Sequence, residues 1–180
     1  MARLPNPQRE DLSAEWQQTW DQIWQTRSPG QGPQSVLMHV PPLAVRVAQQ
    51  GDYLRFHGLL PAADRELAML ATGREVEARF EWQAHEPLAR KEGVRPEAIE
   101  AVRSKGSVEG LTPHERVIVE VVRSLYRQRR IPDELFQRAL AELGKERLVE
   151  LVALAGHYGL LGFILNGFEV DLPPNTAPTF

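Results

Sequence analysis

Cysteine is absent from all 180 residues of the sequence. This absence excludes disulfides, thiolate nucleophiles, iron–sulfur clusters and cysteine-ligated zinc. An excess of positive charge is also missing, because the formal net charge is −3. The arginines between residues 123 and 130 are diluted by acidic residues nearby in the sequence, so nucleic acid is not an expected partner.

Long hydrophobic runs are missing as well. No uninterrupted run of about 18 apolar residues occurs, which is the length that a membrane-spanning helix needs. The first ten residues, MARLPNPQRE, have neither an apolar core nor a cleavage pattern. We therefore expect no membrane span, no secretory signal and a cytoplasmic location.

Alternation of apolar and polar residues, the pattern of a half-buried strand, is not found either. Apolar residues instead recur at helical spacing, and an all-α fold is expected. We expect a polar arm over residues 1–12, a single helical domain over residues 13–172 and an extended tail over residues 173–180.

Proline, glycine and capping residues set the expected helix boundaries. The sequence Thr112-Pro113-His114-Glu115 predicts a capping box. Gly73 is expected to separate two helices, and residues 27–35 are expected to form a loop. Other helices are expected over residues 13–26, 41–56, 75–92, 96–103, 113–130, 132–143 and 145–167. In the first of these, three tryptophans at helical spacing indicate a packing surface more than a ligand site: Trp16, Trp20 and Trp24.

The helix expected over residues 75–92 carries two ionisable groups on its apolar side. Glu81 and His85 are one turn apart and project among small apolar residues, opposite the charged face. The charged face holds the pairs Glu75 with Arg79 and Glu86 with Arg90.

Three interpretations of Glu81 and His85 remain open from their spacing. They can form an acid/base pair in a pocket, an ion pair that fixes helix packing, or two ligands of a metal. The metal is the least favoured, because both the HExxH pattern and the Glu-x-x-His spacing of di-iron bundles are missing.

A set of motifs resembles the carboxymuconolactone decarboxylase and alkylhydroperoxidase D family. The set comprises Arg65-Glu66-Leu67-Ala68-Met69-Leu70, Gly73, Phe80-Glu81-Trp82-x-x-His85, Ala89 and Gly93-Val94, followed by LTPHERVIVEVV and ELVALAGHYGLLGFILNGFEVDLP. The resemblance covers about residues 35–172. It implies an orthogonal bundle of helices like that of alkylhydroperoxidase D, and assembly into homotrimers or hexamers.

The resemblance also implies roles for particular residues. In the peroxidase branch, a glutamate and a histidine relay protons to a CxxC pair, and these two residues fall on Glu66 and His85. The two cysteines fall on Ala78 and Glu81, so this chain is a cysteine-less member and peroxidase activity through a disulfide cycle is not expected. The decarboxylase branch, which lacks the CxxC pair and uses no cofactor, fits better.

We therefore expect a cofactor-independent, metal-free lyase or isomerase that acts on a small carboxylated lactone or related organic acid. Glu66, Glu81 and His85 are its expected catalytic residues. The expected substrate-binding residues are Phe80, Trp82, His57, His157 and Tyr158. The alternative is a non-catalytic member that keeps the helices for ligand binding or assembly. A pocket that reaches His85 favours the enzyme, whereas a closed contact favours the scaffold.

Overall fold

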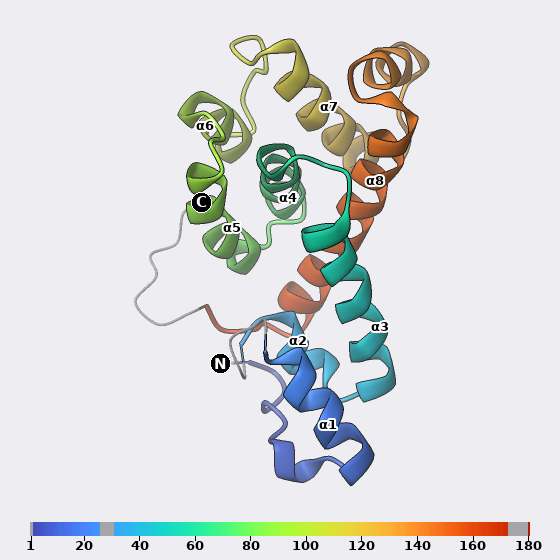
Figure 1. Cartoon of the computed structure of the whole chain (residues 1–180). Coiled ribbons are helices and arrows are strands. Elements are labelled where there is room, and N and C mark those ends of the chain that lie inside the picture. Colours follow the sequence, from blue (N-terminus) through green and yellow to red (C-terminus); the bar gives the residue numbers. More distant parts are fainter. Residues whose placement is uncertain (1, 26–30, 173–179) are drawn as a thin grey trace.

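Figure 1 shows the computed structural model of the chain, which describes residues 2–25, 31–172 and 180. These residues form eight α-helices, one 3-10 helix and one π-helix, and no strand occurs among them. The expected all-α fold is confirmed. The helices are η1 (Arg9–Asp11), α1 (Ala14–Ile23), α2 (Pro33–Leu37), α3 (Pro41–Asp52), η2 (Tyr53–His57), α4 (Ala62–Glu75), α5 (Arg79–Lys91), α6 (Pro96–Arg103), α7 (Pro113–Gln128) and α8 (Asp133–Gly167).

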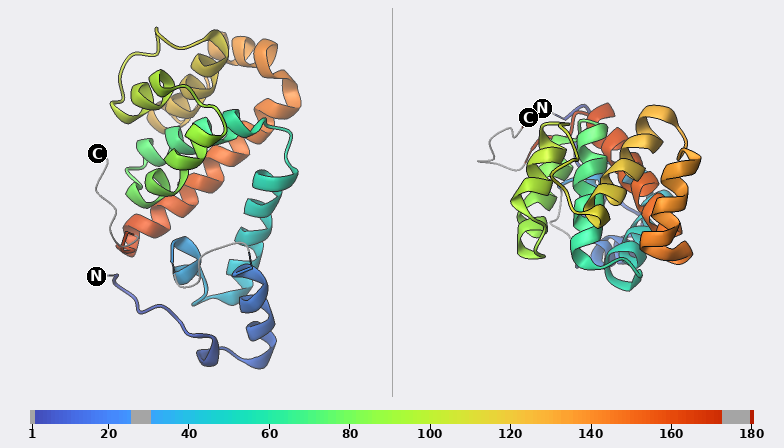
Figure 2. Two further views of the ribbon diagram at one scale, coloured as in Figure 1. Left: turned by 60° about the vertical axis from the view of Figure 1, so that its left-hand side comes forward. Right: turned by 90° about the horizontal axis from the view of Figure 1, so that it is seen from above.

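Helix α4 is the centre of a bundle that includes α5, α6, α7 and α8 (Figure 2). Every residue from Glu66 to Gly73 is buried, so α4 has no solvent-exposed face over two turns. A helix that is buried all round is a core helix, and its position is fixed by its neighbours on every side. A polar group in the middle of α4 therefore has little freedom to move.

Helices α1, α2 and α3 form a smaller group beside the C-terminal half of α8 (Figure 1). Two of the three tryptophans of α1 pack together there, with the ring centroids of Trp20 and Trp24 5.3 Å apart. Their contact supports the packing interpretation of this aromatic stripe. The loop expected over residues 27–35 ends earlier than expected, because α2 begins at Pro33. Residues 27–30 of this loop lie outside the described residues.

The break expected at Gly73 does not occur. Helix α4 continues to Glu75, and the chain turns at Glu77, which has a φ of 57°. Gly73 is needed for packing instead, since a Cβ at this position would lie 3.3 Å from the Cβ of Glu81 on α5. The pair expected between Glu75 and Arg79 is wrong for the same reason: Glu75 belongs to α4 and its carboxylate binds Arg127 on α7.

Two other expected boundaries are confirmed. Thr112 and Glu115 form the capping box at the start of α7, with the Thr112 hydroxyl accepting a hydrogen bond from the Glu115 N–H. Gly144 has a φ of 75°, so the helical path of α8 is interrupted between the two expected helices. The C-terminal part of α8, after Gly144, then crosses the bundle as a core helix.

Helix α8 is long and apolar enough to cross a membrane by length and composition alone, with a mean hydropathy of 1.8 over its most apolar 18 residues. Of those residues, 61% are buried inside the protein. The contacts with α7 are close, because a Cβ at Gly159 would collide with the Tyr126 hydroxyl. Core helices of soluble proteins share these properties, so α8 is weak evidence for a membrane span. The cytoplasmic location stays a prediction.

Both ends of the described chain contact the bundle. In the N-terminal arm, the backbone N–H of Arg3 donates to the carbonyl oxygen of Phe168, 2.9 Å away. At the other end, the Phe180 ring lies edge-on to the Trp82 indole, with centroids 5.5 Å apart. The tail residues between, 173–179, lie outside the described residues.

The buried carboxylate of Glu150 connects α8 to the segment between α3 and α4. One oxygen accepts a hydrogen bond from the Tyr53 hydroxyl (2.8 Å), and the other accepts the backbone N–H groups of Leu59 and Leu60 (2.5 and 3.2 Å). These three donors fix the turn that follows η2. The position of η2 relative to α8 therefore depends on this carboxylate.

We expect Glu150→Gln to lower the free energy of unfolding by about 1–2 kcal/mol, because an amide supplies only one of the two acceptor oxygens and no charge. Urea unfolding followed by circular dichroism measures the loss. The matched control is Glu146→Gln on an exposed part of the same helix, which should change the stability by less than about 0.5 kcal/mol. Equal stability of the two variants would contradict the role of Glu150.

Candidate active site

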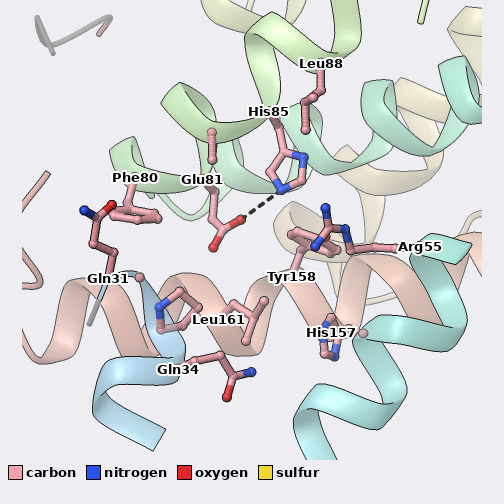
Figure 3. A pocket seen from close by; sticks show the side chains of 14 residues that line it. Gln31, Gln34, Arg55, Phe80, Glu81, His85, Leu88, His157, Tyr158 and Leu161 are labelled. Atoms are coloured by element: carbon pink, nitrogen blue, oxygen red, sulfur yellow. Dashed lines mark ion pairs between the residues drawn. The ribbon is translucent and has the colours of Figure 1, made fainter. Parts of the chain in front are cut away.

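A pocket of about 330 Å³ lies where the N-terminal helices meet the bundle (Figure 3). This volume is at the small end of the range for ligand sites in proteins. Its walls come from residues 31–34 at the start of α2, from α3 and η2, from α5 and from α8. Segments far apart in the sequence therefore enclose one partly open cavity.

His85 lies at the edge of this pocket between two carboxylates. Its Nδ1 is 2.8 Å from Oε2 of Glu66 on α4, and its Nε2 is 3.5 Å from Oε2 of Glu81 on α5. All three side chains are at least nine-tenths buried. Glu81 and His85 line the pocket (Figure 3), whereas Glu66 belongs to the buried helix α4 and does not line it.

Local sequence explains this arrangement. Glu81 and His85 are four residues apart on α5, so both side chains leave the same face of the helix. Helix α4 packs against that helix, and Gly73 lets the two approach closely at Glu81. The expected proximity of the three groups agrees with the structure.

The charge state of His85 follows from its two partners. Burial alone would lower the pKa of the imidazole, but the hydrogen bonds and charges of Glu66 and Glu81 raise it to about 9. At neutral pH the ring is therefore an imidazolium, in which both N–H groups can donate. The contact of Nε2 with Glu81 is long, and this N–H faces the same space as the pocket.

Three of the five residues expected to bind substrate line the pocket: Phe80, His157 and Tyr158. The ring of Tyr158 packs edge-on to that of His85, with centroids 5.2 Å apart. His157 contacts Gln50 through Nδ1 at 3.2 Å. His157 and Tyr158 come from α8, whereas Phe80 lies beside Glu81 on α5 (Figure 3).

The other two expected substrate-binding residues, Trp82 and His57, do not line the pocket. Trp82 is fully buried on another face of α5, where its indole N–H donates to Glu86 at 2.7 Å. Successive helical residues differ by about 100° in direction, so a neighbour of Glu81 need not share its face. His57 is exposed at the end of η2 and does not line the pocket.

Sequence reasoning missed three polar residues of the pocket: Gln31, Gln34 on α2 and Arg55 on η2. Gln34 is 5% exposed, and its side-chain oxygen has no hydrogen-bond partner among the described residues. A positive φ of 70° at Gly32 lets the chain pass within contact of the Phe80 ring just before α2 begins. The one available signal was Gly32-Pro33, a glycine before a helix-starting proline.

No metal-binding group of three or more His, Cys, Asp or Glu side chains is found in the part of the chain that the structure describes. The Nδ1 atom of His85 and the Oε2 atom of Glu66 are already directed at each other. The pocket therefore offers proton-transfer groups and hydrogen-bonding groups.

Comparison with known proteins gives one family match and a consistent fold. Residues 41–124 match the carboxymuconolactone decarboxylase family. No curated protein matches the sequence. One similar solved structure is the alkylhydroperoxidase AhpD core of an uncharacterized peroxidase-related protein from Ralstonia eutropha, with 17% identity and a TM-score of 0.76 over 96% of this chain and 93% of that one.

Two further structures share the fold. A peroxidase-related protein from a Silicibacter species has 11% identity and a TM-score of 0.77, covering 96% of this chain and 92% of that one. A cysteine-to-alanine variant of the debrominase Bmp8, in complex with 2,3,4-tribromopyrrole, has 14% identity and a TM-score of 0.76, covering 97% and 94%. The family match over residues 41–124 and the shared fold together support a carboxymuconolactone decarboxylase/AhpD-like family member.

We expect the ring of His85 to titrate by NMR with a midpoint near pH 9, because two carboxylates stabilise its charged form. Glu66→Gln should lower that midpoint. The folded-state pKa lies above the unfolded value of about 6.5, so the stabilisation is complete below pH 6.5 and is lost as the pH rises through 9. A midpoint at or below 6.5 in the wild-type protein would show that burial dominates instead.

Proposed function

We propose that this protein is a cofactor-independent acid/base enzyme that acts on a small carboxylated lactone or related organic acid, as a decarboxylase or an isomerase. The observation that carries the proposal is the placement of Glu81 and His85 on the wall of a pocket, with Glu66 behind the imidazole. Family membership supports the same class of reaction. A pocket that reaches His85 also favours an enzyme over a non-catalytic scaffold.

In this proposal the three residues have different roles. Glu66 holds Nδ1 of His85 and so fixes the direction of the ring. His85 presents its Nε2–H to a substrate carbonyl oxygen and stabilises the negative charge that develops there. Glu81 exchanges a proton with the neighbouring carbon, as a carboxylate base or, once protonated, as an acid.

For decarboxylation, the bond between the substrate carbon and its carboxylate breaks and carbon dioxide leaves. The electron pair moves onto the adjacent carbonyl to form an enolate, which the Nε2–H of His85 stabilises. The carbon then takes one proton from protonated Glu81, and solvent protonates Glu81 again. For isomerisation, Glu81 removes a proton from one carbon and returns it to another, so no atoms are lost.

The likeness to peroxidase-related proteins does not extend to thiol chemistry. A thiol peroxidase forms and reduces a disulfide, and this sequence has no cysteine. At the two positions where the resemblance places cysteines stand Ala78, which is buried at the start of α5, and Glu81. Acid/base chemistry, by contrast, can use the carboxylate of Glu81 and the imidazole of His85, which line the pocket.

We expect Glu81→Gln to lower kcat by about 10²–10⁴-fold on any substrate found among carboxylated lactones and β-keto acids, because the amide keeps the shape but transfers no proton. Release of carbon dioxide and proton NMR of the products measure turnover. The control Glu92→Gln, exposed at the end of the same helix, should retain full activity. Unchanged turnover in a correctly folded Glu81→Gln variant would show that Glu81 has a structural role and no catalytic one.

We also propose self-association through the outer face of α8, with a second copy of this chain as the partner. Three large apolar side chains there are exposed at 68%, 40% and 64%: Val149, Leu160 and Phe163. Together with Gly156 they are spaced seven, four and three residues apart, so they share one face of the helix. This spacing is the pattern of a helix that packs against another helix.

The substitution Phe163→Lys should shift the protein to a smaller species in light scattering, because it places a charge in that face. Glu134→Lys, which lies before Gly144 and outside the face, is the control. A monomeric wild-type protein at micromolar concentration would refute self-association.

A further inference from the structure

Arg55 is a charged side chain in the pocket to which the proposed acid/base chemistry gives no role. It comes from the π-helix η2 and is half-buried, and its guanidinium is directed toward the centre of the pocket in Figure 3. No carboxylate of the described residues lies within 4 Å of it. The Cζ atom of its guanidinium lies 4.9 Å from the centroid of the Phe56 ring.

The position of Arg55 is determined by its surroundings. Leu54, beside it, is buried, and the turn after η2 is held to α8 by Glu150. Isolated π-helical turns of this kind are rare and are common at functional sites. The backbone that carries Arg55 is therefore fixed on both sides while its head group faces the cavity.

The other pocket charges do not neutralise Arg55. Glu66 and Glu81 both contact His85, and neither forms an ion pair with the guanidinium. A partly buried guanidinium with five donors and no anion is a site for a carboxylate, which it binds with two parallel hydrogen bonds. The pocket wall also includes Gln34 on α2, whose buried side-chain oxygen has no hydrogen-bond partner among the described residues.

We propose that Arg55 is the residue that recognises the substrate, by binding a carboxylate that the reaction leaves in place. This inference rests on the proposed function. An ion pair stabilises a carboxylate and so opposes its loss as carbon dioxide, because only interactions that strengthen in the transition state accelerate the reaction. The group bound at Arg55 is therefore not the group that reacts near Glu81 and His85.

The division of the pocket defines the substrate class. The reacting carbonyl lies against α5, and the retained carboxylate lies against η2. The side-chain oxygen of Gln34 accepts a hydrogen bond from a further donor such as a hydroxyl, and a volume of about 330 Å³ limits the molecule to a small one. A decarboxylated substrate then has two carboxylates, and an isomerised substrate has at least one.

Binding of an inert diacid tests the subsite without turnover. We use glutarate as the probe and its neutral diamide as the matched ligand, measured by calorimetry and protein NMR. The wild-type protein should bind glutarate and not the diamide. Arg55→Gln should weaken glutarate binding by about 10- to 100-fold, and Arg55→Lys should weaken it less, since lysine keeps the charge but not the planar fork.

Two controls separate this result from charge and folding effects. Arg46→Gln removes one positive charge from an exposed site on α3 outside the pocket, and should leave the affinity for glutarate within twofold. Circular dichroism checks the fold of every variant. Failure of the wild-type protein to bind glutarate, or equal affinity in wild-type protein and a folded Arg55→Gln, would overturn the assignment.

Steady-state kinetics distinguish this inference from the proposed function. With a substrate in hand, Arg55→Gln should raise KM more than it lowers kcat, whereas Glu81→Gln should lower kcat with little change in KM. Loss of glutarate binding in Arg55→Gln supports the subsite even where no acid is turned over. Normal turnover with unchanged KM in Arg55→Gln overturns the subsite and leaves the acid/base proposal standing.

Discussion

The contact between Glu66 and His85 is the interaction on which the pocket depends. Two buried ionisable groups, from two different helices, meet at 2.8 Å. Each would be costly to bury alone, and together they satisfy each other only when α4 and α5 keep their relative position. The burial of α4 on every side supplies that constraint. The direction of the imidazole in the pocket is thus a consequence of how the core is packed.

The pocket is assembled from parts with different origins. The segment that matches the family, residues 41–124, contains Arg55, Glu66, Glu81 and His85. The remaining walls lie outside it, at residues 31–34 and on α8. In terms of the proposal, the family segment holds the proton-transfer groups and the flanking helices shape the cavity around them. The flanks are where a change of sequence would alter the size of the ligand without moving the acid and the base.

The sequence predicted part of this site for a clear physical reason. Glu81 and His85 stand out because ionisable groups on an apolar helix face need a pocket or a partner, and helical spacing alone reveals the face. Glu66 was found through the resemblance to a family. Its distance from His85 depends on how two helices pack, which spacing along one helix does not contain.

The parts that were missed depend on tertiary contacts. Arg55 looks like an ordinary surface arginine in the sequence, and only the path of η2 brings it to the cavity. Trp82 follows Glu81 directly but leaves α5 about 100° away, toward the core. A helix break is expected at Gly73 because glycine in a helix costs about 1 kcal/mol relative to alanine, but α4 continues through it, and the missing side chain leaves room for Glu81 on α5.

The carboxylate at position 81 changes what the histidine can do. In the peroxidase branch, the resemblance places a cysteine at this position, and the histidine relays protons to the thiols. Here a second carboxylate faces the ring, and the pKa of His85 rises to about 9. The ring then stays protonated at neutral pH and acts as a hydrogen-bond donor and a positive charge. Such a group stabilises an enolate oxygen better than it accepts a proton, and under the proposed function the proton acceptor is therefore the neighbouring carboxylate of Glu81.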